Sequence, residues 1–203
     1  MSIEFLSYYL CSRMCHDLSS SVGATSNCID LLDEDRNENA DTLNLAKQSI
    51  NMAVNQLKFY RSAFGVTQNS LNFKDTKKLA NLVIPNKRIS LEWDETCNNI
   101  KFNPGTLQLI LNLLLVAKDF LPTGGLIFVN CDTNKIFVRI KSEKIDLDKD
   151  IIEAFNGTLE KKSLSSKNAP SFLINKLALE KQIDFDYSLE KENIYLFKIQ
   201  EKY

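Results

Sequence analysis

The sequence predicts an α+β protein, with an N-terminal antiparallel helical hairpin that forms a dimeric four-helix bundle, followed by an α/β sandwich. Three observations predict this fold class. Two long stretches before residue 65 carry apolar residues at alternating steps of three and four, and from about Ser70 short helical and strand patterns alternate. Proline and glycine separate those later patterns. The chain has 203 residues, enough for one large or two small domains.

Both N-terminal stretches have the spacing of helices that pack lengthwise on other helices. The first seam comprises Leu10, Met14, Leu18, Val22, Thr25, Ile29 and Leu32, and the second comprises Leu43, Ala46, Ile50, Ala53, Leu57, Tyr60 and Phe64. The polar segment 33–39 is too short for anything but an antiparallel hairpin. Because two helices cannot cover both seams and no second hairpin follows, we expect a homodimer in which both seams are core.

The rest of the chain is expected to form one mixed sheet covered by helices. Asp75 is expected to cap a helix that Pro85 ends, a strand spans 88–93, and Pro104 opens a helix that runs to about residue 120. Strands at 126–131 and 136–140, helices at 149–155 and 171–180, and closing strands at 183–187 and 194–199 follow. We expect residues 1–67 to form the hairpin and residues 68–203 to form the α/β domain.

Composition excludes several classes of protein. The net charge of −1, with 25 basic and 26 acidic residues interspersed, gives no nucleic-acid footprint. No apolar run reaches the roughly 18 residues of a membrane span, and the first residues lack the positive region of a signal peptide, so we expect a cytoplasmic protein with no membrane partner. The five cysteines, Cys11, Cys15, Cys28, Cys97 and Cys131, form an odd set without CxxC spacing, which favours reduced, partly buried thiols.

His16 is the one histidine of the chain and the most informative residue. It lies two residues from both Met14 and Leu18, so at about 100° per residue it points away from the first seam, toward water. The same face carries Ser12, Arg13, Ser19, Ser20, Gly23 and Asn27. A lone imidazole on a polar face of a bundle helix suggests a phosphoryl carrier or a general base, although a solitary exposed histidine is more often an ordinary surface residue.

Three segments resemble a known family: Leu10–Asp17, Phe59–Gly65 and Leu107–Gly125. They are similar to alphaproteobacterial histidine phosphotransferases of the ChpT type, which carry an Arg-x-Cys-His-Asp core, a Phe-Gly that closes the second helix, and a Leu-Asn-Leu-Leu-Leu run that ends in Gly-Gly. The resemblance implies a histidine-kinase-like dimerisation bundle with a degenerate, GHKL-like second domain. It also implies a dimer that relays phosphate from the receiver domain of a CckA-like hybrid kinase to CtrA-like and CpdR-like response regulators.

The sequence itself argues against ATP binding by the second domain. A kinase site needs an asparagine near the end of the helix from Leu107 to hold Mg²⁺, and glycine-rich loops to approach the nucleotide. Val116 stands where that asparagine is expected, and neither Lys141–Asp146 nor Ser165–Pro170 contains a glycine. We therefore expect no cofactor on this chain, with Mg²⁺ supplied by the partner receiver domain.

The chemistry assigns a role to each residue near His16. Imidazole has an ordinary pKa of about 6.5, and its neutral form keeps one ring-nitrogen lone pair for a phosphoryl group. We expect catalytic roles for His16, Asp17 and Arg13: Asp17 accepts a hydrogen bond from the other ring nitrogen, and Arg13 contacts transferring oxygens. Partner binding is expected at Ser12, Ser19, Ser20, Gly23 and Asn27. Three of these residues also have an ordinary interpretation, since Asp17 and Asn27 fit a solvated helix face and Arg13 fits a local ion pair.

Three functions therefore compete at this point. The first is a histidine phosphotransferase that relays a phosphoryl group through phospho-His16. The second is an ATP-dependent histidine kinase, which the missing glycines and Val116 disfavour. The third is a non-catalytic dimeric scaffold that binds receiver domains without transferring phosphate.

Overall fold

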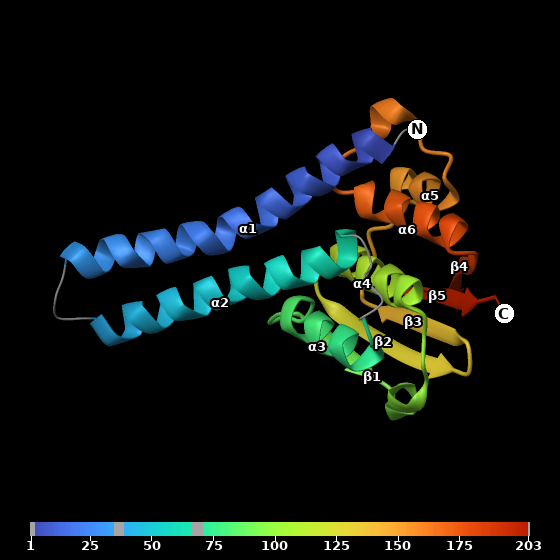
Figure 1. Ribbon diagram of the computed structural model, residues 1–203, viewed down its shortest axis with the longest axis horizontal. Coiled ribbons are helices and arrows are strands. Elements are labelled where there is room, and N and C mark those ends of the chain that lie inside the picture. The colour runs from blue at the N-terminus through green and yellow to red at the C-terminus, as the bar shows by residue number, and fades with distance from the viewer. Residues whose placement is uncertain (1–2, 35–38, 66–70, 203) are drawn as a thin grey trace.

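Two long antiparallel helices extend from one side of an α/β sandwich in the computed structural model, which describes residues 3–34, 39–65 and 71–202 (Figure 1). Helix α1 spans Ile3–Glu34 and helix α2 spans Asn39–Phe64, so the predicted hairpin is confirmed. The connecting residues 35–38 and the expected domain boundary at 67/68 lie outside the described residues. None of the helices in the described part of the chain is long and apolar enough to cross a membrane.

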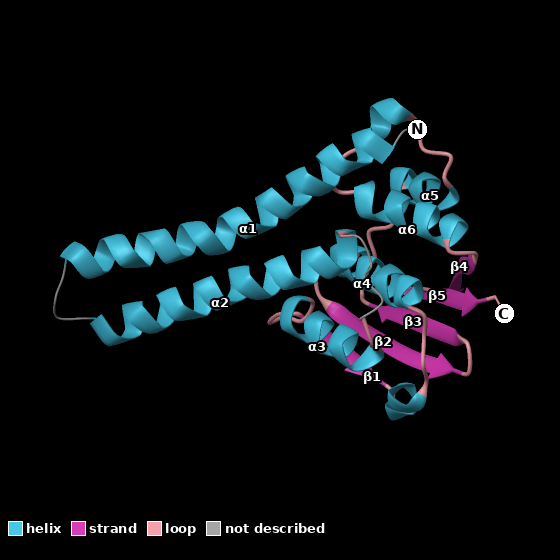
Figure 2. Ribbon diagram, in the orientation of Figure 1, coloured by secondary structure: helices cyan, strands magenta, loops and turns pink. Residues whose placement is uncertain are grey.

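The sandwich is built on a five-stranded mixed sheet with helices on one of its sides (Figure 2). Its elements are α3 (Phe73–Val83), β1 (Ile89–Trp93), η1 (Glu95–Asn99), α4 (Pro104–Asp119), β2 (Gly125–Asp132), β3 (Lys135–Lys141), α5 (Lys149–Asn156), η2 (Lys161–Ser163), α6 (Ala169–Glu180), β4 (Ile183–Lys191) and β5 (Ile194–Glu201). The strand order is β1-β2-β3-β5-β4, with β1 and β2 parallel and the other pairs antiparallel. The predicted α+β class is confirmed, and each expected strand and helix exists within a few residues of its predicted bounds.

Helix α4 forms the centre of the core and also holds the end of α2. Its residues 106–117 are all buried. Two of them are amides: Gln108 Nε2 donates to the carbonyl oxygens of Ala63 (3.2 Å) and Gly65 (2.7 Å), and Asn112 Nδ2 donates to that of Ala63 (2.7 Å). The last carbonyls of a helix lack partners within the helix, so these buried amides satisfy the end of α2 and fix it on the sandwich.

The N-terminal part of α1 packs against the sandwich as well. Leu6 and Leu10 are buried in a cluster with Leu159, Leu164 and Phe172, which come from the segment around η2 and from α6. This apolar contact lies near the start of α1, and the amide contact of α4 lies at the end of α2. The sandwich is therefore attached to both helices of the hairpin at the end that carries His16.

The expectation that both seams are core holds for only part of each seam within one chain. On α2, Ala46, Ala53 and Tyr60 are buried, whereas the alternate positions Leu43, Ile50 and Leu57 are exposed and Phe64 is half-buried. We call the exposed seam residues Val22 and Ile29 on α1 and Leu43, Ile50 and Leu57 on α2 the apolar stripe. A heptad has two apolar positions per seven residues, and only one of them faces the other helix of this hairpin.

The cap of α3 differs from the prediction. Asn72, not Asp75, is the N-cap, and its Oδ1 accepts from the backbone N–H of Asp75 at 2.9 Å. Asp75 instead occupies the first turn and its Oδ2 accepts from Asn72 Nδ2 at 2.7 Å. Asparagine caps as well as aspartate does, and the helix gains one more turn from the earlier start.

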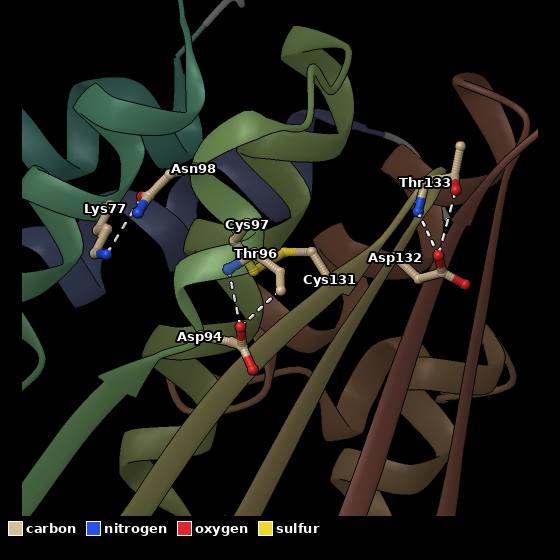
Figure 3. The surroundings of a disulfide bond; sticks show 8 residues. All are labelled: Lys77, Asp94, Thr96, Cys97, Asn98, Cys131, Asp132 and Thr133. Atoms are coloured by element: carbon tan, nitrogen blue, oxygen red, sulfur yellow. Dashed lines mark hydrogen bonds between the residues drawn. A yellow bond between two sulfur atoms is a disulfide. The ribbon is translucent and has the colours of Figure 1, made fainter.

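The cysteines also differ from the prediction. Cys97 in η1 and Cys131 in β2 form a disulfide with Cα atoms 5.0 Å apart (Figure 3). Cys11 and Cys15 are exposed and Cys28 is half-buried, so partial burial was predicted correctly for Cys28 alone. The two paired residues are 34 positions apart, and spacing along the chain does not reveal that β2 brings them together.

Candidate functional site

His16 lies on the outer face of α1, as its position relative to the seam predicts. Its side chain is 85% exposed. One ring nitrogen, Nδ1, is 3.1 Å from Oδ1 of Asp17. A carboxylate can only accept, so Nδ1 is the donor, and in the neutral ring the lone pair belongs to Nε2.

Asp17 is the centre of the site and connects three side chains. Its Oδ1 accepts from His16, and its Oδ2 accepts from Arg13 Nε at 2.9 Å and from the hydroxyl of Tyr60 on α2. The expected hydrogen bond from His16 to Asp17 is therefore present. The carboxylate is half-buried, and the three donors face it from α1 and α2.

Arg13 uses every nitrogen of its guanidinium on a carboxylate. Besides the contact of Nε with Asp17, Nη1 donates to Asp119 Oδ2 at 2.7 Å and Nη2 donates to Asp119 Oδ1 at 3.0 Å. Asp119 is the last residue of α4. This fork of paired N–H groups fits a carboxylate bidentately, which fixes both partners in one geometry. Arg13 is thus placed to orient Asp17 and to join α1 to the sandwich, rather than to extend toward solvent.

Burial and charge set the protonation state of this network. Burial by itself favours the neutral form of Asp17, but the Tyr60 hydrogen bond, the Arg13 charge and the His16 hydrogen bond outweigh it, so the pKa of Asp17 lies below its ordinary value. Burial and the contact with Asp17 both raise the pKa of Tyr60. For Arg13, the hydrogen bond and charge of Asp119 outweigh burial and raise the pKa. At neutral pH the network therefore contains a carboxylate, a protonated phenol and a guanidinium.

An open cleft of about 610 Å³ begins at His16 and reaches the sandwich. It is lined by Arg13, His16, Asp17, Ser20, Gln56, Tyr60, Val83, Lys118, Asp119, Asp146, Ser166 and Lys167. Lys118 Nζ donates to the carbonyl of Val83 at 3.1 Å, and burial lowers its pKa. Lys167 Nζ is 3.1 Å from Asp148 and 3.5 Å from Asp146. The cleft thus has one wall from the hairpin and another from the sandwich, with charges of both signs.

The other residues expected at the site are exposed on α1, and only one reaches the cleft. Ser20 lines it beside His16. Ser12, Ser19, Gly23 and Asn27 are exposed on the helix outside the cleft lining. Ser19 Oγ donates to the carbonyl of Cys15 at 2.7 Å, and a Cβ added at Gly23 would have no atom within 4 Å. The helix surface around His16 is therefore open.

Several residues of the network and cleft are absent from the sequence-based assignment, among them Tyr60, Asp119 and Lys118. Tyr60 was assigned only to the second seam, although its hydroxyl is a polar group at a buried position, which needs a partner. Lys118 and Asp119 are the last two residues of α4, the strongest apolar helix of the sandwich, and nothing in the sequence relates them to α1. The Tyr60 hydroxyl was a usable signal; the other two required the fold.

The matching family model decides between the three competing functions. It is that of the histidine phosphotransferase C-terminal domain, and it matches residues 73–193, more than half of the chain. The chain belongs to the histidine phosphotransferase family. This membership confirms the expected histidine phosphotransferase and disfavours the ATP-dependent kinase and the inert scaffold.

Two further comparisons agree with the family. The chain is 27% identical over 192 residues to the protein phosphotransferase ChpT of Brucella abortus (strain 2308), with 91% of this chain and 90% of that protein covered. The structure of a bacterial phosphotransferase superposes with a TM-score of 0.82 over 98% of each chain at 22% identity, which shows a shared fold. These findings confirm the predicted resemblance of the chain to ChpT-type proteins.

Proposed function

We propose that the chain relays a phosphoryl group between receiver domains through Nε2 of His16. The observation that carries this proposal is the contact of Nδ1 with Asp17 in a ring that is otherwise 85% exposed. This contact holds the Nδ1–H tautomer and leaves the lone pair of Nε2 facing outward. An exposed and oriented imidazole is what a carrier needs, because both donor and acceptor must reach the same nitrogen.

The transfer step is a displacement at phosphorus. Nε2 attacks the phosphorus of a receiver's phosphoaspartate in line with the aspartyl oxygen, the N–P bond forms, and the P–O bond to the aspartate breaks. The aspartate leaves as a carboxylate, and the reverse step delivers the group to the next receiver. Asp17 keeps its hydrogen bond to Nδ1 and offsets the positive charge on the ring. The receiver supplies Mg²⁺ and the rest of the transfer site.

The sandwich serves in this proposal as a docking platform for the receiver domain. Lys118, Lys167 and Asp146 line the cleft that begins at His16, so a receiver over His16 contacts side chains of both parts of the chain. We assign phosphotransfer and dimerisation to residues 1–67, and docking without ATP binding to residues 68–203. The similarity to ChpT-type proteins supports the receiver domain of a CckA-like hybrid kinase as donor and CtrA-like and CpdR-like response regulators as acceptors in this proposal.

We also propose that the working form is a homodimer. Exposed leucine, isoleucine and valine side chains repeat every seven residues in the apolar stripe, for example Leu43, Ile50 and Leu57 on α2. Such a continuous stripe supports burial against another helix pair. The second copy supplies that pair and completes a four-helix bundle with one His16 on each side.

The proposal is tested by incubating the chain with a purified receiver domain phosphorylated by acetyl phosphate. We expect wild type to acquire acid-labile, alkali-stable phosphate, and His16→Ala to acquire none. Because His16 is 85% exposed, we expect the His16→Ala protein to keep the wild-type fold, which circular dichroism checks. Equal binding of the receiver by both proteins, with no phosphate on either, would establish the scaffold instead.

Nucleotide binding tests the kinase alternative separately. Val116 is buried within α4, and the segment around η2 packs Leu159 and Leu164 against α1. We expect isothermal titration with Mg-ATP to give no measurable heat of binding. Micromolar affinity for ATP, together with phosphorylation of His16 in the absence of a receiver, would replace the relay with a kinase.

A further inference from the structure

We propose that Tyr60 is a positioning residue for phosphoryl transfer, whose hydroxyl fixes Asp17 and through it the reactive tautomer of His16. This inference deepens the proposed function and rests on it. Tyr60 does not contact the transferred group in the proposal. It acts on the reaction through the side chain of Asp17.

The hydrogen bonds of Asp17 divide between its two oxygens. Oδ1 accepts from Nδ1 of His16, and Oδ2 accepts from the Tyr60 hydroxyl and from Arg13 Nε. Rotation of the carboxylate about its Cβ–Cγ bond would break both contacts of Oδ2. The two donors on Oδ2 therefore hold Oδ1 toward the imidazole.

Tyr60 is the more deeply buried of these two donors. Its side chain is 2% exposed, its ring stacks on Phe64 with centroids 5.2 Å apart, and it meets Phe59 edge to face at 5.7 Å. A tyrosine has only two side-chain torsions, whereas Arg13 has a long flexible stem whose position depends on Asp119. Because Tyr60 belongs to α2 and Asp17 to α1, the contact also joins the two helices of the hairpin at the level of His16.

The protonation states of the pair point in the same direction. The pKa of Tyr60 is raised by burial and by the contact with Asp17, and the pKa of Asp17 is lowered by its donors against the effect of burial. The phenol therefore remains a donor and the carboxylate remains an acceptor at neutral pH. With Oδ1 facing the imidazole, Nδ1 must donate, and the lone pair belongs to Nε2.

The test compares Tyr60→Phe, which keeps the ring and removes the hydroxyl, with Tyr187→Phe as a matched control. Tyr187 lies on β4, and its hydroxyl pairs with Asn156 at 3.2 Å, so this substitution removes a phenolic hydrogen bond outside the cleft. The measured quantity is the rate at which a phosphorylated receiver domain transfers its phosphate to His16. We expect Tyr60→Phe to be about three- to thirty-fold slower, with Tyr187→Phe equal to wild type.

A spectroscopic measurement separates positioning from a merely structural role. Because His16 is the one histidine of the chain, the ¹⁵N spectrum of tag-free protein labelled at histidine reports this ring alone. At a pH where the ring is neutral, we expect wild type to show the Nδ1–H tautomer and Tyr60→Phe to show a larger share of the Nε2–H form. Unchanged ring-nitrogen shifts and an unchanged rate in Tyr60→Phe would overturn the proposal.

A double-variant cycle with Asp17→Asn tests whether the effect passes through Asp17. In that background the carboxylate is already lost, so we expect removal of the Tyr60 hydroxyl to change the rate less than two-fold. An undiminished effect there would show that Tyr60 acts by another route and would overturn the proposal. If Tyr60→Phe does not fold by circular dichroism, 4-fluorophenylalanine at position 60 fills the space of the hydroxyl without a donor.

The two proposals fail separately. If wild-type protein accepts no phosphate from any receiver, the relay fails, but the tautomer of His16 in wild type and in Tyr60→Phe still tests the control of His16 by Tyr60. If wild type accepts phosphate and Tyr60→Phe does so at the same rate with the same ring-nitrogen shifts, the relay holds and the role of Tyr60 is refuted.

Discussion

Arg13 and Asp119 form a bidentate ion pair that joins α1 to the last residue of α4. The two contacts are 2.7 Å and 3.0 Å long, between residues 106 positions apart in the chain. The same guanidinium donates to Asp17, the neighbour of His16. The sandwich therefore helps to set the orientation of Asp17 beside His16, which gives the second part of the chain a role at the proposed phosphorylation site in addition to the proposed docking.

Weakening this ion pair is expected to affect both stability and transfer. Asp119→Asn keeps the shape of the side chain and removes its charge. Arg13 then loses the bidentate contact that holds its guanidinium against Asp17. We expect the free energy of unfolding to fall by about 1–3 kcal/mol, because the charge of Arg13 stays partly buried without its full partner. Urea unfolding measures the loss, and phosphate uptake from a receiver is expected to slow in parallel.

Glu190→Gln is the matched control for this experiment. Arg139 on β3 and Glu190 on β4 form a second fork-like pair, with contacts of 2.6 Å and 2.9 Å. Since both of these side chains are about one third exposed, their pair contributes within about 1 kcal/mol of stability. An Asp119→Asn protein as stable and as fast as Glu190→Gln would contradict the coupling between the sandwich and the site.

The pH dependence of stability is expected to reveal Asp17. Its pKa is lowered in the folded protein, whereas an aspartate in the unfolded chain has a pKa of about 3.9. The stabilisation is therefore present above about pH 4 and is lost as the pH falls toward the folded-state pKa. We expect the difference in unfolding free energy between wild type and Asp17→Asn to stay constant from pH 7 to about 5 and to shrink below about 4. A difference in unfolding free energy that stays unchanged down to pH 3 would contradict the lowered pKa of Asp17.

The periodicity of the sequence was enough to predict the hairpin, the sandwich and the exposure of His16. These features follow from local rules: apolar spacing, Pro104 at a helix start, and the position of His16 two residues from each neighbouring seam residue. Asp17 was predicted for the same reason, because it is adjacent to His16 in the chain. What the sequence did not reveal depends on contacts between distant segments. Asp119 reaches Arg13 only because α4 ends beside α1 in the fold.

The disulfide and the Tyr60 contact show the same limit. Cys97 and Cys131 are 34 residues apart and meet because η1 packs against β2. Tyr60 fitted the apolar seam by spacing, and its ring is buried as a seam residue should be. Its hydroxyl, however, acquires a partner from α1 only when the two helices align at one particular register. Spacing thus identified the element and the face but not the side chain across from it.

The thiols provide a direct test of the corrected cysteine assignment. We expect iodoacetamide under native, non-reducing conditions to modify Cys11 and Cys15 readily and Cys28 slowly, because the first two are exposed and the third is half-buried. Cys97 and Cys131 are expected to react only after reduction and unfolding. Mass spectrometry of the digested protein identifies each site. Alkylation of Cys97 or Cys131 without reductant, in protein purified under air, would restore the earlier expectation of free thiols.

The apolar stripe is expected to hold the dimer together. Ile50 and Leu57 are 43% and 53% exposed in one chain, and Met52, on another face of the same helix, is 56% exposed. A glutamate at Ile50 or Leu57 puts a charge into the proposed interface, where its burial without a partner is costly. A glutamate at Met52 stays in water. In light scattering we expect wild type and Met52→Glu to have twice the chain mass of 23.2 kDa, and Ile50→Glu to have the single mass. Exposure is similar at all three positions. If the stripe variants dissociate to single chains and Met52→Glu does not, the interface is assigned to the stripe. An intact Ile50→Glu dimer would place the interface elsewhere.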